Sequence, residues 1–203
     1  MENRPLVLGS TSRYRSALLA RLGIAFATAA PGVDEAPLPG ETPAATCERL
    51  AQAKARAVAA RYARALVIGS DQVADADGVA VGKPGNRAEA IAQLSMLSGR
   101  SIVFHTGVAL ADAESGRCHV RRVDVTTRFR RLSRATIEAY VDRERPFDCA
   151  GSIKSEGLGI ALVEAIENAD PTALIGLPLI AVVDLLQREG VDVVAFAAHR
   201  DAP

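Results

Sequence analysis

A short apolar stretch that runs directly into an acid constrains this chain more than any other feature. Residues 66–73 read Leu-Val-Ile-Gly-Ser-Asp-Gln-Val, and β-branched side chains of this kind suit a buried strand. We expect Asp71 at or just past the end of that strand, where open α/β sheets gather their ligands. The alternative is an Asx-turn that stops the strand, because Ser-Asp is common turn chemistry.

Composition excludes several classes of protein. With 203 residues, 49% of them hydrophobic and 24% charged, the chain can bury its own core as one domain over residues 1–203. Lys plus Arg equals Asp plus Glu at 24 each, so no global field favours nucleic acid, and the arginine run at 121–131 is expected to be a solvated face.

Cysteine usage and hydropathy indicate the compartment. The three cysteines have no CxxC spacing, which argues against a disulfide framework and against a zinc site. No run of the sequence reaches the roughly eighteen apolar residues of a membrane span. We therefore expect a cytoplasmic location and no membrane partner.

Strand and helix signals alternate along the chain, which predicts an α/β fold with a mixed sheet. Residues 27–43 are rich in Pro and Gly and predict an ordered loop or a short strand with turns. Strands are expected at 5–9, 66–73, 79–81, 102–110, 120–129 and from 160 onward. Helices are expected after the caps at 10–12 as far as 22, then at 46–62, from a cap at Asn86 to 97, from a cap at Ser133 to 144, and between Pro178 and Gly190.

The first predicted helix begins in a loop that suits an anion. Ser10, Thr11 and Ser12 supply hydroxyl caps, and a helix N-terminus presents free N–H groups and the positive end of its dipole. Arg13 and Arg15 add positive charge there. The alternative is a capped helix with solvated arginines.

Other charged residues fall in or near loops. Glu35 lies in the Pro-rich segment and Lys54 near the apolar face of a predicted helix. Lys83 follows a hairpin expected around the turn pair Asp77-Gly78, which would return it toward Asp71. Residues 150–159 crowd small residues around Lys154 and Glu156, and their alternative interpretation is a flexible turn. A solvated acid and a snorkelling lysine are the ordinary alternatives for Glu35 and Lys54.

Together these residues suit a nucleotide. Cations and helix N–H groups neutralise phosphates, two carboxylates hold a hydrated Mg²⁺, and an aromatic residue with a polar partner reads a base. Neither a Walker A motif nor GxGxxG is present, and His105, His119 and His199 lack a nucleophile-elbow partner. The inventory is Tyr14, Arg15, Glu35, Lys54, Asp71, Lys83, Lys154 and Glu156.

The same segments resemble the motifs of a known family, the Maf nucleoside triphosphate pyrophosphatases, and most closely its YceF-like branch, which hydrolyses 7-methyl-GTP. The resemblance runs from about residue 6 to residue 190 and is carried by Ser10–Arg15, Val33–Glu35, Lys54, Gly69–Gln72, Gly82–Pro84 and Cys149–Gly157. It implies a Maf/ITPase-like fold, with an elongated mixed sheet flanked by helices and two lobes around a central cleft. It also implies a divalent cation, Mg²⁺ or Mn²⁺, a cytoplasmic location and a homodimer.

The resemblance assigns roles by position. Asp71 matches the proton acceptor, and Glu35 is the candidate second carboxylate for the metal. The positions that set substrate choice are Tyr14, Gln72 and Glu156, where the branch acting on dTTP and UTP typically has Arg, Thr and Gln. Substrate-binding positions are Ser10, Arg15, Lys54, Lys83 and Lys154. Arg13 departs from the pattern, because relatives commonly have Pro there.

The expected reaction is hydrolysis of 7-methyl-GTP at the α–β phosphoanhydride, which gives 7-methyl-GMP and pyrophosphate and clears a modified nucleotide. Two alternatives stay open: a pyrophosphatase for dTTP or UTP, and a nucleotide-binding regulator of septum formation without turnover. Whether Asp71 is base, metal ligand or both is also open at this point.

Overall fold

One seven-stranded mixed sheet forms the centre of the computed structural model, which describes residues 4–198. The strand order is β2-β1-β3-β5-β6-β7, and β4 pairs with β3 alone. β1 is parallel to β2 and to β3, whereas the remaining pairs are antiparallel. The strands are β1 (Leu6–Leu8), β2 (Phe26–Thr28), β3 (Leu66–Ala76), β4 (Val79–Val81), β5 (Ser101–Asp112), β6 (Cys118–Phe129) and β7 (Val163–Glu167). The predicted α/β class with a mixed sheet is confirmed.

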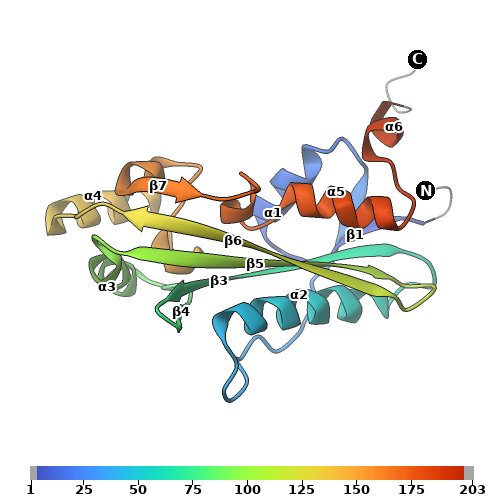
Figure 1. Cartoon of the computed structure of the whole chain (residues 1–203), viewed down its shortest axis with the longest axis horizontal. Coiled ribbons are helices and arrows are strands. Elements are labelled where there is room, and N and C mark those ends of the chain that lie inside the picture. Colours follow the sequence, from blue (N-terminus) through green and yellow to red (C-terminus); the bar gives the residue numbers. More distant parts are fainter. Residues whose placement is uncertain (1–3, 199–203) are drawn as a thin grey trace.

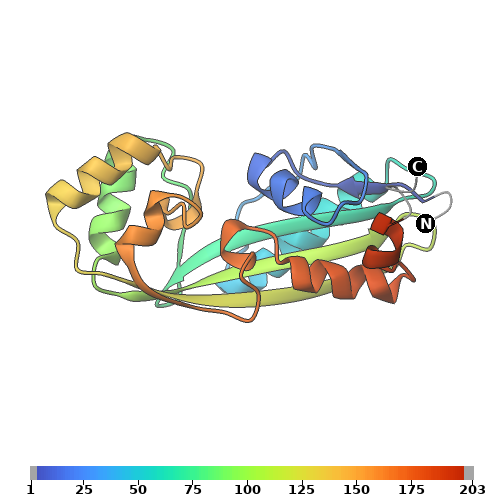
Figure 2. The same ribbon diagram turned by 90° about the horizontal axis from the view of Figure 1, so that it is seen from above.

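Six α-helices within the described residues flank this sheet. Figures 1 and 2 show an elongated molecule with α2 under one face of the sheet, α1 and α5 over the other, and α3 and α4 together at one end. The helices are α1 (Arg13–Ala20), α2 (Pro43–Ala59), α3 (Arg87–Leu97), α4 (Arg134–Glu144), α5 (Leu179–Arg188) and α6 (Val193–Ala198). Three short 3₁₀ segments complete the regular structure: η1 (Ala150–Ser152), η2 (Leu158–Leu162) and η3 (Ala173–Ile175).

Separate apolar clusters stabilise the two ends of the sheet. At one end, α3, α4 and the 3₁₀ segments pack on the far halves of β3, β5 and β6, around Phe104, Phe129 and Tyr140. At the other end, α1 and α5 cover one face and α2 covers the opposite face. The long strands connect both ends, so residues in the middle of β3 lie between the two helical groups (Figure 2).

Two glycines allow α2 to approach the sheet closely. A Cβ atom on Gly69 would lie 2.3 Å from the carbonyl oxygen of Ala51, and one on Gly107 would lie 2.5 Å from that of Cys47. Real side chains do not fit in such a space, so these neighbouring positions of β3 and β5 are filled by helix backbone. Because α2 lies this close to the sheet, its side chains can reach residues of β3.

Two elements begin three residues away from the positions expected from the sequence, and one helix was not expected. α2 begins at Pro43 rather than Thr46, because the side chain of Thr42 caps it and proline is well suited to a first helical position. The last strand begins at Val163 rather than Ile160, because the preceding residues form the 3₁₀ turn η2 and pairing with β6 begins at Val163. The helix α6 was not predicted.

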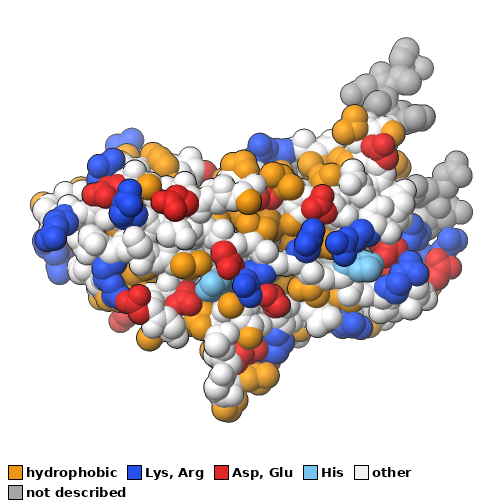
Figure 3. Space-filling model, viewed as in Figure 1, with side chains coloured by type: hydrophobic (Ala, Val, Ile, Leu, Met, Phe, Trp, Pro, Cys, Tyr) orange, Lys and Arg blue, Asp and Glu red, His pale blue; other side chains and the backbone are white. Residues whose placement is uncertain are grey.

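Charges on the open face of the sheet are mixed. Figure 3 shows blue and red side chains interspersed along the molecule rather than a single basic patch. Arg122 donates to Glu48 at 2.7 Å, and Arg128 donates to Glu164 at 3.1 Å. These ion pairs confirm that this arginine run belongs to a solvated face. No helix in residues 4–198 combines the length and the apolarity needed to cross a bilayer.

A buried carboxylate joins the end of α5 to the start of β6. Glu189, with 3% of its side chain exposed, accepts from Arg117 at 2.9 Å and lies 3.1 Å from His119 Nε2. The Arg117 hydrogen bond outweighs burial and holds the pKa of Glu189 below its ordinary value. The ion pair therefore stabilises the fold above the unfolded-state pKa of about 4.3, and the contribution is lost as pH falls through the lower folded-state pKa.

We expect Glu189→Gln to lower the free energy of unfolding at pH 7 by about 1–3 kcal/mol, because it removes the charge of a buried carboxylate that accepts from Arg117. Urea unfolding at several pH values measures this. The gap between wild type and variant should narrow below about pH 4. Glu164→Gln, which removes an exposed ion pair, is the matched control and should change stability by less than about 1 kcal/mol. A pH-independent gap would contradict the electrostatic origin.

Candidate active site

Asp71 lies within β3, not at its end. The strand continues to Ala76, and Asp71 is paired with Gly107 of β5. The expected strand end at Asp71 was therefore wrong, and so was the Asx-turn alternative. Residues 73–76 alternate between the two sheet faces as strand residues do, and the hairpin turn at Asp77 ends the strand instead. Asp71 is 7% exposed and directs its carboxylate toward α2.

A buried lysine joins two carboxylates. Lys54, 4% exposed on α2, places its Nζ 2.7 Å from Asp71 Oδ1 and 2.7 Å from Glu35 Oε1. Lys54 is therefore not a snorkelling surface residue, and Glu35 is not simply solvated. Burial alone would raise the pKa of Glu35, but the hydrogen bond and charge of Lys54, together with Lys83 and Arg15, bring it below its ordinary value. Glu35 is a carboxylate at neutral pH.

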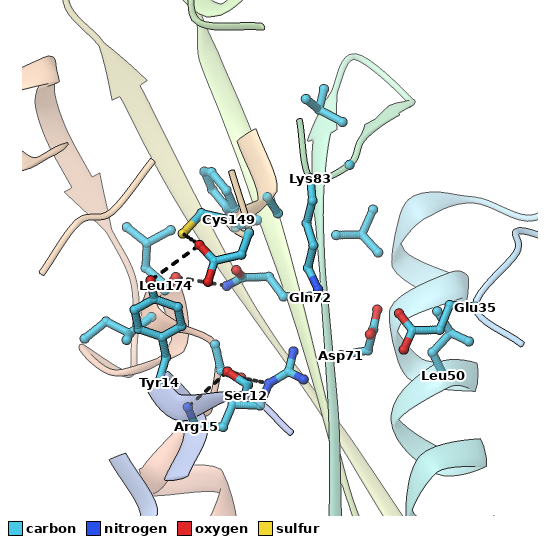
Figure 4. A pocket seen from close by; sticks show the side chains of 18 of the residues that line it. Ser12, Tyr14, Arg15, Glu35, Leu50, Asp71, Gln72, Lys83, Cys149 and Leu174 are labelled. Carbon is cyan, nitrogen blue, oxygen red and sulfur yellow. Dashed lines mark hydrogen bonds between the residues drawn. The ribbon is translucent and has the colours of Figure 1, made fainter. Parts of the chain in front are cut away.

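Two further cations approach from opposite sides. Figure 4 shows Lys83 extending from beyond β4 toward Asp71, while Arg15 reaches in from α1. Arg15 Nε donates to the carbonyl of Gly176 at 2.9 Å, which fixes its guanidinium at the edge of the cavity. Burial lowers the pKa of Arg15, and the charges of Asp71 and Glu35 oppose that effect. The sequence-based expectation that Lys83 returns toward Asp71 is confirmed.

These residues line a cleft with two connected parts. The first cavity, of about 340 Å³, lies between Asp71 and the segment 148–156, and the second, of about 540 Å³, lies against the loop before α1. Arg15, Glu35, Lys54 and Lys83 line both. The cleft as a whole is large enough for a nucleotide, since ligand pockets commonly measure about 300–1,000 Å³.

The second cavity lies against the start of α1, the helix terminus that was expected to suit an anion. Ser12 caps α1 and accepts from the backbone N–H of Arg15, and Ser10 accepts from the N–H of Ser12. Ser10 and Ser12 line this cavity together with Arg13, Arg15 and Lys83. A helix N-terminus and three cations around one cavity favour a polyphosphate.

The first cavity has aromatic, acidic and apolar side chains in its lining. Tyr14, Gln72 and Glu156 line it, together with the apolar side chains of Phe104 and Leu174. Gln72 Nε2 lies 3.0 Å from the carbonyl oxygens of residues 173 and 174 and from Thr106 Oγ1. Because carbonyl oxygens accept only, both amide hydrogens are used within the protein. Gln72 therefore has its Oε1 left to act as an acceptor.

One predicted site residue is placed differently. Lys154 Nζ donates to the carbonyl of Glu144 at the end of α4, and Lys154 does not line either cavity. Its role in substrate binding stays a prediction. Conversely, Asp148 lines both cavities and was not singled out in the sequence. No local pattern marks it, because its position depends on how the segment after α4 folds back toward α1.

The carboxylates fit a divalent cation. Mg²⁺ is usually bound through one or two carboxylates and completed by water and substrate phosphates. Glu35 and Asp71 provide such a pair, both within 2.7 Å of the same Lys54 nitrogen. No group of three or more His, Cys, Asp or Glu suitable for a metal occurs in the described part of the chain. A cation here would thus depend on phosphate oxygens for its remaining ligands.

The elongated mixed sheet, with a cleft that is cationic at one end and acidic and aromatic at the other, defines an α/β protein built to hold a nucleotide. The chain belongs to the Maf family: the model for "Maf-like protein" matches residues 5–189. This confirms the resemblance that the motifs indicated.

Curated relatives cover almost the whole chain. A 7-methyl-GTP pyrophosphatase from Albidiferax ferrireducens is 55% identical over 94% of this chain and 96% of its own length. One of the same name from Polaromonas sp. is 56% identical over 93% of this chain and 86% of its own length. A third, from Thiobacillus denitrificans, is 53% identical over 95% of this chain and 96% of its own length.

Proposed function

We propose that this chain is a hydrolase acting on phosphorus-containing anhydrides, which cleaves 7-methyl-GTP into 7-methyl-GMP and pyrophosphate. The observation that carries the proposal is that the two ends of the cleft differ in charge and in residue type. Lys54, Lys83 and Arg15 surround Asp71 at one end, while Tyr14 and Glu156 line the other. The names of the relatives support the same substrate.

The cationic end receives the triphosphate. Arg15, Lys83 and the N–H groups at the start of α1 face the second cavity, where the β- and γ-phosphates would lie. Positive groups fixed in this way stabilise the charge that develops on the departing pyrophosphate, and they need no reorganisation during the reaction. A divalent cation held by Glu35 and Asp71, when bound, would add neutralising charge on the phosphate oxygens.

Asp71 is placed to act on water. A water oxygen attacks the α-phosphorus, the bridging bond to the β-phosphate breaks, and the water proton passes to the Asp71 carboxylate. Lys54 holds that carboxylate at 2.7 Å from one of its oxygens, which fixes its orientation and leaves the second oxygen for the water. This mechanism gives Asp71 the roles of base and of metal ligand together.

The other end selects the base. Guanine presents N1–H and N2–H₂ as adjacent donors, and Glu156 and Gln72 Oε1 are acceptors. N7-methylation places positive charge on the ring, which favours the face of Tyr14 by about 0.5–2 kcal/mol. Burial raises the pKa of Tyr14, so its phenol is neutral and its ring stays a neutral π-surface at physiological pH. A neutral pyrimidine base benefits from neither feature.

The test is pyrophosphate release from 7-methyl-GTP, GTP, dTTP and UTP with Mg²⁺ or Mn²⁺. We expect the highest kcat/KM on 7-methyl-GTP. Glu156→Gln should narrow the advantage of 7-methyl-GTP and GTP over dTTP and UTP by about tenfold, because one acceptor for the guanine N–H donors becomes a donor. Tyr14→Ala should lower kcat/KM more for 7-methyl-GTP than for the other three nucleotides.

Each alternative predicts a different result in that assay. A pyrophosphatase for unmodified nucleotides would prefer dTTP or UTP. A regulator of septum formation without turnover would bind nucleotide and release no pyrophosphate. The intact Asp71–Lys54–Glu35 group favours turnover over such a regulator. A homodimer and a cytoplasmic location are part of the proposal, and sedimentation and cell fractionation test them.

A further inference from the structure

A second carboxylate lies at the base end of the cleft. Asp148 follows α4 in the chain, has a side chain that is 54% exposed, and lines both cavities. Its Oδ1 lies 3.5 Å from the hydroxyl of Tyr14. Lys54 and Lys83 instead act on Asp71 and Glu35, and Figure 4 shows these two acids across the cavity from Tyr14 and Cys149.

The ring of Tyr14 and the carboxylate of Asp148 already hold a planar cation. The guanidinium of Arg13 lies 4.8 Å from the centroid of the Tyr14 ring, and its Nη2 lies 4.0 Å from Asp148 Oδ2. The Arg13 side chain is 74% exposed, so this ion pair is weak and a competing cation can replace it. A 7-methylguanine ring is also a flat ion with delocalised positive charge, and it would meet the same two partners.

We propose that Asp148 is a specificity-determining residue that favours the positively charged 7-methylated base over guanine; this rests on the proposed function. Asp148 acts through charge, whereas Glu156 reads the hydrogen-bond donors that both bases share. The two acids therefore differ in what they select. Glu156 distinguishes guanine from other bases, and Asp148 distinguishes a cationic guanine from a neutral one.

Geometry supports a charge effect rather than a hydrogen bond. The methylated N7 has no proton to donate, so a carboxylate can recognise it through charge and not through a hydrogen bond. Between charges about 4 Å apart that are screened as strongly as in bulk water, that attraction is worth about fivefold in affinity. The effect should be screened by salt, because the carboxylate is half exposed.

The experiment compares the affinities of 7-methyl-GMP and GMP with Mg²⁺ present, by calorimetry. Neither monophosphate has an α–β bond, so binding is measured without turnover. We expect Asp148→Asn to lower the affinity for 7-methyl-GMP about fivefold and to change the affinity for GMP by less than about twofold. Asp148→Glu should retain most of the preference, and Glu164→Gln controls for the loss of one charge remote from the cleft.

The dependence of the preference on ionic strength is a second measurement. It would not respond to Asp148→Asn if Asp148 had only a structural role. Raising the ionic strength should reduce the preference for 7-methyl-GMP in the wild type and leave it unchanged in Asp148→Asn. Equal weakening of both ligands by Asp148→Asn, or no preference in the wild type, overturns the inference. Failure of the proposed function is a separate result: a chain that binds 7-methyl-GMP selectively but releases no pyrophosphate from 7-methyl-GTP.

Discussion

Replacing Asp71 by Asn is expected to lower kcat for 7-methyl-GTP by roughly a hundredfold or more, the scale of losing a general base or metal ligand. Asn has nearly the same shape, and the backbone pairing of Asp71 with Gly107 is independent of the side chain. The fold should therefore survive. What is lost is the negative charge beside Lys54, and with it the proton acceptor for the attacking water.

A matched variant lies four residues along the same strand. Asp75 points to the same face of β3, but it contacts His105 at 3.2 Å and lies outside the cleft. Asp75→Asn should leave kcat within about threefold of wild type, because it removes a comparable charge without touching the cleft. Initial rates of pyrophosphate release and thermal unfolding of both variants provide the comparison. Near-normal turnover by Asp71→Asn would remove Asp71 from the mechanism.

Local features of the fold were predictable from sequence. Ser12, Asn86 and Ser133 were each expected to cap a helix, and each side chain accepts from the backbone N–H three residues on. The Asp77-Gly78 turn was expected to form a hairpin, and Ala76 pairs with Val79 across it. Such contacts join residues close in sequence, so the residue types alone carry the information.

Features that depend on contacts between distant segments were less predictable. From the sequence, Lys54 was expected near the edge of a helix face. Its burial follows from the close approach of α2 to β3, and the residues around Lys54 in the chain give no sign of that approach. Lys154 belongs to a motif, yet its side chain turns to the end of α4. Asp148 lies in no recognisable pattern, because the pairing of its segment with α1 spans more than a hundred residues of chain.

The tight contact between α2 and the sheet leads to the second large prediction. We expect Gly69→Ala to lower the free energy of unfolding by about 3 kcal/mol, at the upper end of ordinary overpacking costs. The added methyl would lie 2.3 Å from Ala51 O and 2.5 Å from Ala55 N, and these are helix backbone atoms that cannot rotate away. For a chain of this size, that loss corresponds to a fall in Tm of about 6–12 °C.

The same substitution should impair catalysis, since α2 carries Lys54 and must move outward to admit the methyl group. Displacing the Nζ from its 2.7 Å contacts with Asp71 and Glu35 releases both carboxylates, so kcat should fall about tenfold or more even where the variant is fully folded. Gly82→Ala is the control for stability, because a Cβ there meets nothing within 4 Å and its φ lies outside the left-handed range. An unchanged Tm for Gly69→Ala would mean that α2 does not rest on the sheet at this distance. A lowered Tm with unchanged kcat would mean that catalysis does not require Lys54 to stay between the two acids.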